Sequence, residues 1–369
     1  MTYPLLLIFA RMRIWVIYCV LMLLTAPVRG QRQNSFGIVP QYGFVIPHRP
    51  SMGVLLQGHV RGVELDLVRH TDGAEAWQRL YHRPDYGLHL FIADLGNPSM
   101  LGQGYAAVPY IGFPIITKPH ARLTFNLGSG IGYISHIFDV RENYKNVAIG
   151  SHVNGIMQAE LDGRVYLSQR TALHGRFVFT HFSNGAWKVP NLGINIPTLG
   201  LGLSHTFGKA LKTEVADTLP TSLPKWSLRF LIAGGLKEVI RFGGGKYPVG
   251  LFQTACMRGL GKSNSLGLGL DCIYNSSLPE LLSDTAGNKG SARDGFRLGL
   301  LLPYELKIAR FVLALQVGYY IINAYPAQGT YYQRIGWRYE LNSRVALSYS
   351  LKLHLSKADN MELGIVYSL

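Results

Sequence analysis

The sequence predicts an all-β protein, a transmembrane antiparallel β-barrel of the outer-membrane type with about 14–16 strands. Three observations lead to this fold class. The chain begins with a secretory signal, its polar and apolar residues alternate in segments of about ten residues, and Tyr and Trp lie near the ends of these segments. In a bilayer every backbone group must find its partner inside the protein, so a closed barrel is the β-structure that can span it.

The composition agrees with this fold class. Charged residues make up 15 % of the 369 residues, below the roughly 25 % of soluble domains, and Gly is abundant with 42 residues. A chain that is 48 % hydrophobic is expected to collapse, which excludes disorder. After the N-terminus no apolar run approaches the roughly 18 residues of a spanning helix, which excludes a helical membrane protein with several spans.

Residues 1–30 have the pattern of a secretory signal peptide. An apolar run at 14–28 follows Arg11 and Arg13 and ends close to small residues. The run is short for a spanning helix, so we expect cleavage and not a retained anchor. Removing this segment takes away three arginines and no acid, which lowers the formal charge from +15 to +12.

The alternation defines the strands one by one. In the segment 172–183, for example, Phe177 and Phe179 face one side while Arg176 and Val178 face the other. The complete set of expected strands lies near 36–46, 53–68, 85–94, 103–115, 121–135, 152–168, 172–183, 195–207, 225–235, 247–257, 264–274, 294–304, 308–320, 331–341, 344–355 and 360–369.

A polar, Pro-containing stretch at 209–224 divides these strands into two sets of eight. We therefore expect a first barrel half at 31–208, a periplasmic connection at 209–224 and a second barrel half at 225–369. One large barrel built from all strands is the favoured arrangement. The alternative is an eight-stranded barrel followed by a second eight-stranded unit.

Two polar residues stand out on an outward face. His181 and Ser183 share the side of their strand that carries the phenyl rings, so both are expected to point towards lipid near the extracellular end. Polar side chains in that place cost free energy. Headgroup level would tolerate both, but an imidazole beside a hydroxyl is also what nucleophilic attack on an acyl carbonyl requires.

The segment Thr180 to Asn195, with the sequence THFSNGAWKVPNLGIN, resembles the active-site signature of the lipid A 3-O-deacylase (PagL) family. It is closest to the longer members called acyloxyacyl hydrolases. The shared core is H-x-S-N at a strand end, followed by a P-N-x-G turn. The resemblance spans about 36–208, is sharp over 177–207, and does not reach the second half of the chain.

This resemblance implies His181 as the general base, Ser183 as the nucleophile and Asn184 as a group that helps to hold the oxyanion. Other residues of the segment shape the turn that follows: Gly185, Pro190, Asn191 and Gly193. One position departs from the family. The third catalytic residue is a Glu twelve residues after the Ser, where this chain has Asn195. Its amide can orient His181 but cannot offset the charge of an imidazolium.

The implied function is that of an outer-membrane esterase, a carboxylic ester hydrolase that removes an ester-linked acyl chain from lipid A at the lipid-facing barrel surface. Its expected partners are lipopolysaccharide and lipid of the bacterial cell outer membrane, whose phosphates suit the positive net charge; no nucleic acid is expected. No cofactor and no metal are expected, because the cysteines form no zinc motif. Two alternatives stay open: a non-enzymatic pore or transport barrel, and an inactive relative that binds lipopolysaccharide.

Overall fold

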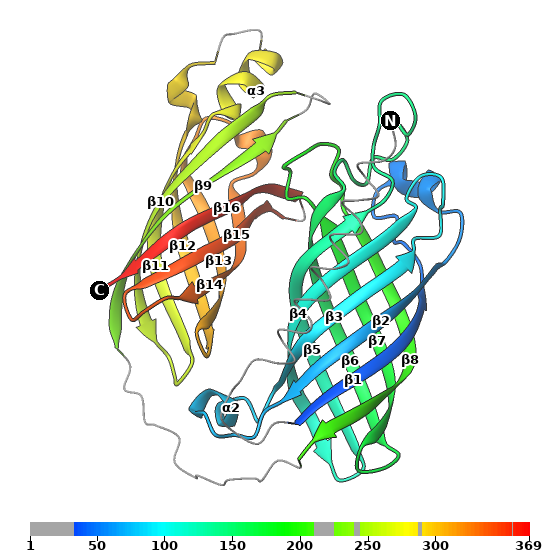
Figure 1. The fold of residues 1–369 in the computed structure, drawn as a ribbon. Helices are drawn as coiled ribbons and strands as arrows, with labels where there is room; N and C mark the ends of the chain where they lie inside the picture. Colours follow the sequence, from blue (N-terminus) through cyan, green and yellow to red (C-terminus); the bar gives the residue numbers. More distant parts are fainter. Residues whose placement is uncertain (1–32, 210–224, 240–243, 287–289, 356) are drawn as a thin grey trace, which may run out of the picture.

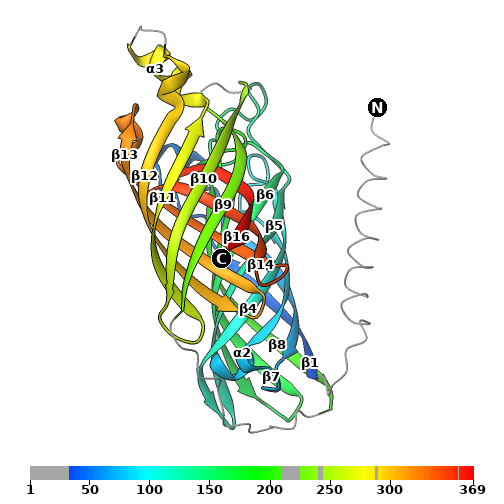
Figure 2. The same ribbon diagram turned by 90° about the vertical axis from the view of Figure 1, so that its left-hand side faces the viewer.

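A computed structural model of the chain describes residues 33–209, 225–239, 244–286, 290–355 and 357–369. Their strands form two closed antiparallel barrels of eight strands each, which lie side by side (Figures 1 and 2). Among these described residues, no helix has the length and apolar character needed to cross a membrane. The expected signal peptide at 1–30 lies outside the described residues, as do residues 210–224 of the connection expected at 209–224.

Each barrel is a simple up-and-down sheet in which every strand pairs with its neighbours along the chain. The strands of the first barrel are β1 (Gln33–Gly43), β2 (Val60–His70), β3 (Asp85–Asp94), β4 (Gln103–Lys118), β5 (Ala121–Ile134), β6 (Val153–Tyr166), β7 (Thr171–Ser183) and β8 (Ile194–Gly208). The strands of the second are β9 (Trp226–Glu238), β10 (Lys246–Gly259), β11 (Asn264–Asn275), β12 (Phe296–Ile308), β13 (Phe311–Asn323), β14 (Tyr331–Glu340), β15 (Val345–His354) and β16 (Lys357–Ser368).

Short helices occupy several connections. They are η1 (Pro50–Leu55), α2 (Ala76–Leu80), α3 (Ser277–Ala286), η2 (Ala292–Gly295) and η3 (Pro326–Gln328). Figure 1 shows α2 and α3 at opposite ends of the barrels. The helix η1 shortens the expected strand at 53–68, which begins only at Val60, because the buried Met52 and Leu55 turn inward as part of an apolar cap.

The β-barrel class and the number of strands are confirmed, whereas the single large barrel favoured from the sequence is wrong. β8 returns to β1, with Phe207 opposite Asn34, and β16 returns to β9, with Leu363 opposite Gly234. The two-unit alternative is therefore correct. Alternation alone does not decide between the two, because inward and outward residues have the same period in a barrel of any size.

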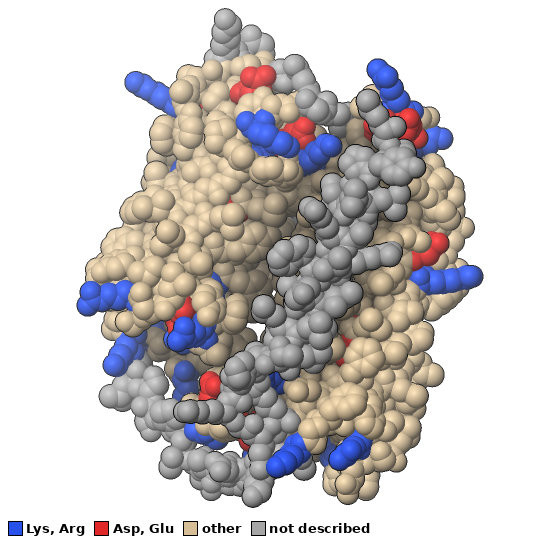
Figure 3. Space-filling model, viewed as in Figure 1, with Lys and Arg blue, Asp and Glu red and all other residues tan. Residues whose placement is uncertain are grey.

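Inward and outward faces follow the expected parity. In β7 the Phe177 side chain is 47 % exposed on the outside, while Arg176 is buried inside. Leu199 and Leu201 of β8 are 67 % and 66 % exposed. Figure 3 shows that most charged side chains lie towards the ends of the barrels, leaving their outer walls mostly uncharged. A wall of this kind suits an apolar environment.

Ion pairs fill the interior of each barrel. In the first, the guanidinium of Arg176 pairs with Glu64 at 2.8 Å and with Asp162 at 3.2 Å, and it also contacts Asp66 and Glu160. In the second, a similar layer joins Arg334 to Asp271 at 2.9 Å and to Glu362 at 2.6 Å. These side chains occupy the lumen, as expected for barrels of only eight strands.

An apolar cap closes one end of the first barrel above this ionic layer. It contains Phe182 of β7 and Ile194 of β8, both fully buried, together with residues of the connections between the strands. Because Phe182 points inward near the end of β7, its two neighbours in sequence, His181 and Ser183, lie on the outer face.

The ionic layer predicts a large effect of Arg176→Met on stability. The substitution leaves four buried carboxylates without their shared cation, so we expect the free energy of unfolding to fall by about 3–5 kcal/mol. Urea titration of the refolded protein in detergent micelles measures this change. The matched control Arg170→Met, at an exposed turn position, is expected to change it by less than about 0.5 kcal/mol. Equal midpoints for both variants would contradict the role assigned to the ionic layer.

Candidate active site

The ends of β7 and β8 bring three predicted site residues together. His181 and Asn195 lie directly opposite each other in the pairing of these strands, and Ser183 follows two residues after His181 on the same face. Asn195 thus has the outward direction that its parity predicts. The luminal Glu160 and Asp162 are buried on the other side of the wall, so neither replaces the missing acid.

A chain of hydrogen bonds fixes the tautomer of His181. Its Nδ1–H donates to Asn195 Oδ1 at 2.6 Å, and Asn195 Nδ2 donates to His48 Nδ1 at 3.2 Å. The Nε2–H of His48 in turn donates to the Leu192 carbonyl at 3.0 Å. One assignment of protons satisfies all three bonds. It leaves the Nε2 of His181 as an acceptor, with no hydrogen-bond partner in the part of the chain that the structure describes.

Nothing in the sequence singled out His48. It lies in the connection after β1, separated from Asn195 by 147 positions, and no motif links the two. The backbone brings it there, because the Ile46 N–H donates to the Asn195 carbonyl beyond the end of β1. This short extension of the β1–β8 pairing turns His48 towards the site.

The hydroxyl of Ser183 is held by two donors. Its Oγ accepts from Asn191 Nδ2 at 2.9 Å and from the Gly185 N–H at 3.2 Å. A hydroxyl offers two lone pairs and one proton. Both lone pairs of Ser183 Oγ accept these hydrogen bonds, so the O–H remains available as a donor. No hydrogen bond joins Ser183 to His181 among the described residues. Catalytic hydrogen bonds are often long in unliganded structures and tighten with substrate.

Asn184 has a different place from the one that the resemblance implies. Its side chain is 2 % exposed and donates to Ser151 Oγ at 2.9 Å and to the Lys188 carbonyl at 2.8 Å. Its backbone N–H donates to Asn191 Oδ1 at 3.1 Å. Both amide hydrogens of the side chain are therefore committed to the fold of the loop at 184–193.

The predicted turn residues let this loop approach the site closely. Gly193 has φ +82°, and a Cβ there would lie 2.7 Å from His181 Cε1. Gly185 has φ +60°, and a Cβ there would collide with Met361 of the second barrel. Pro190, after a cis peptide, packs its carbonyl against Gly150. Side chains at either positive-φ glycine would push the loop away from His181 or from the second barrel.

The second barrel also holds this loop. The buried carboxylate of Glu238 accepts from the Val189 N–H at 2.8 Å, and the Glu238 N–H donates to the Ala186 carbonyl at 2.9 Å. Lys246 donates to the Trp187 carbonyl and lies over the indole ring. Sequence reasoning missed Glu238, because a contact between two separately closed units leaves no signal in strand periodicity.

A cavity of about 680 Å³, lined by both polar and apolar side chains, lies where the two barrels meet at this end. His181 and Ser183 line one side of it, and the second barrel contributes a charged wall. The charged and titratable residues of that wall are Lys237, Glu238, His354, Lys357 and Asp359. The candidate site is thus open to a polar group on the side of the second barrel.

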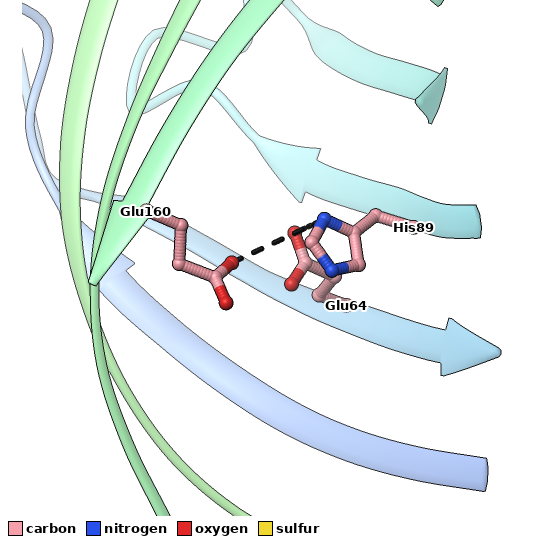
Figure 4. A group of neighbouring side chains, drawn as sticks. All are labelled: Glu64, His89 and Glu160. Atoms are coloured by element: carbon pink, nitrogen blue, oxygen red, sulfur yellow. Dashed lines mark ion pairs between the residues drawn. The ribbon is translucent and has the colours of Figure 1, made fainter. Parts of the chain in front are cut away.

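A second cluster of ionisable groups lies inside the first barrel (Figure 4). Atoms of Glu64, His89 and Glu160 lie within 4.8 Å of one another, a spacing that invites comparison with a metal site. Most of these donor atoms already have partners, although Glu160 Oε2 and His89 Nε2 accept or donate no hydrogen bond among the described residues. Arg176 pairs with both glutamates, and His89 Nδ1 is 2.7 Å from Gln158 Oε1. The cluster belongs to the ionic layer of the lumen and is separated from His181 by the barrel wall.

Two family profiles match the chain and give its class, ester hydrolases of the outer membrane. Lipid A 3-O-deacylase (PagL) matches residues 61–204, and acyloxyacyl hydrolase, C-terminal domain, matches residues 226–369. The chain belongs to the lipid A deacylase/acyloxyacyl hydrolase family and contains one domain of each of these two kinds. The resemblance seen in the segment from Thr180 to Asn195 is confirmed, and the family extends into the second half. Membership implies lipid A as substrate and the outer membrane as location.

The chain also has weak similarity to several solved structures. Neisserial surface protein A (NspA) has a TM-score of 0.30 and 8 % identity, covering 48 % of this chain and 97 % of that one. A Rhodopseudomonas blastica porin variant has a TM-score of 0.18 and 11 % identity, with 91 % and 99 % covered. KdgM porin in complex with disordered oligogalacturonate has a TM-score of 0.19 and 5 % identity, with 90 % and 99 % covered. No curated protein sequence matches the chain.

The hydrogen bond from His181 to Asn195 predicts a defined loss in the variant Asn195→Ala. Without the amide oxygen the imidazole can rotate or change tautomer, so we expect ester hydrolysis to slow by one to two orders of magnitude, about 1.4–2.7 kcal/mol of barrier. Turnover of a chromogenic ester in detergent micelles measures it. Asn195→Glu, which restores the family acid, serves as the comparison and should hold or raise the rate. Full activity in Asn195→Ala would show that Asn195 is a bystander.

Proposed function

We propose that this protein hydrolyses an ester-linked acyl chain of lipid A, with Ser183 as nucleophile and His181 as general base. One observation carries the proposal. Among the described residues, the Ser183 O–H has no acceptor and the His181 Nε2 has no donor, and the two residues occupy neighbouring outward positions of β7. The Ser183 O–H can donate a proton and His181 Nε2 can accept one. Such a pairing of a hydroxyl with a base activates the hydroxyl as a nucleophile.

The reaction then proceeds by acyl transfer. Ser183 Oγ attacks the ester carbonyl carbon while its proton passes to His181 Nε2, giving a tetrahedral oxyanion. The bond to the sugar oxygen breaks, and that oxygen takes the proton from His181. Water next attacks the acyl-enzyme, again with His181 as base, and releases a free fatty acid and the Ser183 hydroxyl.

The oxyanion needs donors close to Ser183 Oγ. The Gly185 N–H and Asn191 Nδ2 already lie 3.2 Å and 2.9 Å from this atom, and both can turn to an oxyanion that forms beside it. Asn184 supports them indirectly, because its amide holds the loop and its N–H binds Asn191. We assign the two donors this role and Asn184 a positioning role.

Asn195 replaces the family Glu in orientation but not in charge. In a serine protease the corresponding change from Asp to Asn costs about 10⁴ in turnover because the histidine adopts the wrong tautomer. Here His48 accepts from Asn195 Nδ2, which keeps the Oδ1 atom turned towards His181 Nδ1–H. The tautomer needed for catalysis is preserved, so the remaining cost is the missing negative charge beside the imidazolium.

The filled interiors count against a pore or transport function. Arg176 in the first barrel and Arg334 in the second are both buried among carboxylates that cross the lumen. Moving an ion past such a layer would require breaking several buried ion pairs. The inactive, lipopolysaccharide-binding relative is instead an outcome of the following experiment.

Mass spectrometry of lipid A from cells that express the protein tests the proposal. Wild type should remove one acyl chain, and Ser183→Ala and His181→Ala should each abolish this loss, since the two residues act as a unit. His205→Ala, at an exposed outward position of β8, is the matched control and should retain activity. Heat-modifiable migration on gels shows that each variant is folded.

Chain loss that persists in both variants would refute the assignment of Ser183 and His181. Unchanged lipid A in the presence of the wild type would favour the inactive relative. In that case, activity gained by Asn195→Glu would show that the missing acid is the cause.

A further inference from the structure

An apolar crevice runs between the outer walls of the two barrels. Its volume is about 960 Å³, within the range of pockets that hold a whole small ligand. The first barrel lines it with outward residues of β3 to β6, including Tyr86, Leu127 and Ile131, and the second with outward residues of β13 to β16. The large side chains from the second barrel are Phe311, Trp337, Tyr349 and Met361.

Contacts between the barrels bound this crevice at both ends. At the end that carries α2, the Tyr81 hydroxyl donates to the Lys307 carbonyl at 2.8 Å (Figure 1). At the end that carries the candidate active site, Glu238 holds the loop at Val189. Trp77 and Trp187 line the crevice, the first in α2 and the second in the active-site loop. The crevice therefore extends along the barrel walls between two fixed points.

The crevice reaches residues next to the nucleophile. Gly155, which lines it, is the partner of Ser183 in the pairing of β6 with β7, and a Cβ there would lie 3.7 Å from the Tyr349 hydroxyl. Met361 lies against Gly185, whose N–H donates to Ser183 Oγ. Two side chains of the second barrel thus stand at the boundary between Ser183 and the crevice.

Two cavities of different character therefore lie close to Ser183. Ser183 lines the cavity with the charged wall, and the crevice lined mainly by apolar and aromatic side chains reaches Gly155, the partner of Ser183 in β6. The ester of an acylated sugar likewise has a polar and an apolar side: a polar sugar is bonded to its ester oxygen and an apolar chain to its carbonyl carbon. The orientation that places the carbonyl at Ser183 sends the chain into the crevice.

We infer that this crevice binds the acyl chain of the scissile ester, and that the second barrel serves as its outer wall. The inference rests on the proposed function for the choice of ligand. Because lipid tails are as apolar as the crevice, burial alone gives little preference for it over bulk lipid. Selection must come from shape, so the depth of the crevice below Ser183 sets the length of chain that is cleaved.

Side chains that fill the crevice test this inference. Ser129 and Leu127 of β5 line it, at successive outward positions leading away from the Gly155 level. Ser129→Trp should lower kcat/KM for a p-nitrophenyl palmitate about tenfold or more and leave p-nitrophenyl butyrate within about twofold. Leu127→Trp, which lies farther from Ser183, should leave kcat/KM unchanged for esters with chains of intermediate length. Leu201→Trp, outward on β8 and 66 % exposed, is the matched control and should change neither ester.

A second measurement does not depend on turnover. Ser183→Ala protein in micelles is irradiated with a palmitoyl ester that carries a diazirine near the end of its chain, and the labelled peptides are mapped. We expect labelling of the second barrel around Trp337 and Tyr349, lost in the double variant with Ser129→Trp and kept in that with Leu201→Trp.

Labelling spread evenly over the outer walls, or a palmitate-to-butyrate ratio that Ser129→Trp does not change, would overturn the inference. Equal loss of both esters would also overturn it, because the substitution would then act on the site and not on chain length. Crevice labelling in a wild-type protein that hydrolyses no ester would refute the proposed function while leaving the chain-binding site in place.

Discussion

The pairing of β8 with β1 and of β16 with β9 is the constraint on which the rest of the structure depends. In an apolar surrounding no strand edge can be left open, so each set of eight strands has to close on itself. Closure at eight strands makes the lumen narrow, and the charged side chains that point inward then have to neutralise one another. Under the proposed function, chemistry with a lipid substrate then takes place on the outer face, where the last residues of β7 and the first of β8 come together.

The site shows how a local change in one residue can be accommodated by a distant one. A neutral amide at Asn195 would be free to turn either its oxygen or its nitrogen towards His181. The contact with His48 removes that freedom, because His48 donates its Nε2–H to the Leu192 carbonyl and its Nδ1 can then only accept from the amide nitrogen. The second barrel contributes in a similar way, because Glu238 and Lys246 hold the loop that carries the proposed oxyanion donors.

Strand periodicity predicted much of this architecture. It placed sixteen strands, the outward direction of His181, Ser183 and Asn195, and the luminal direction of Glu160 and Asp162, because a period of two in sequence is a physical property of every β-strand. It did not predict closure into two barrels, since that depends on which edges pair and not on the pattern within any strand. The contacts of His48 and Glu238 at the site were not predicted from the sequence for a related reason. Their contacts join segments that are far apart in sequence and carry no motif.

In the proposed mechanism the Ser183 hydroxyl is activated as a nucleophile, and its reactivity can be measured without knowledge of the natural ester. An alkyl fluorophosphonate phosphonylates an activated serine, and the intact mass of the protein with peptide mapping locates the adduct. We expect one adduct, on Ser183, which forms at least about tenfold more slowly in His181→Ala and at an unchanged rate in His205→Ala. An adduct on another serine, or modification of Ser183 at the same rate in the absence of His181, would contradict it.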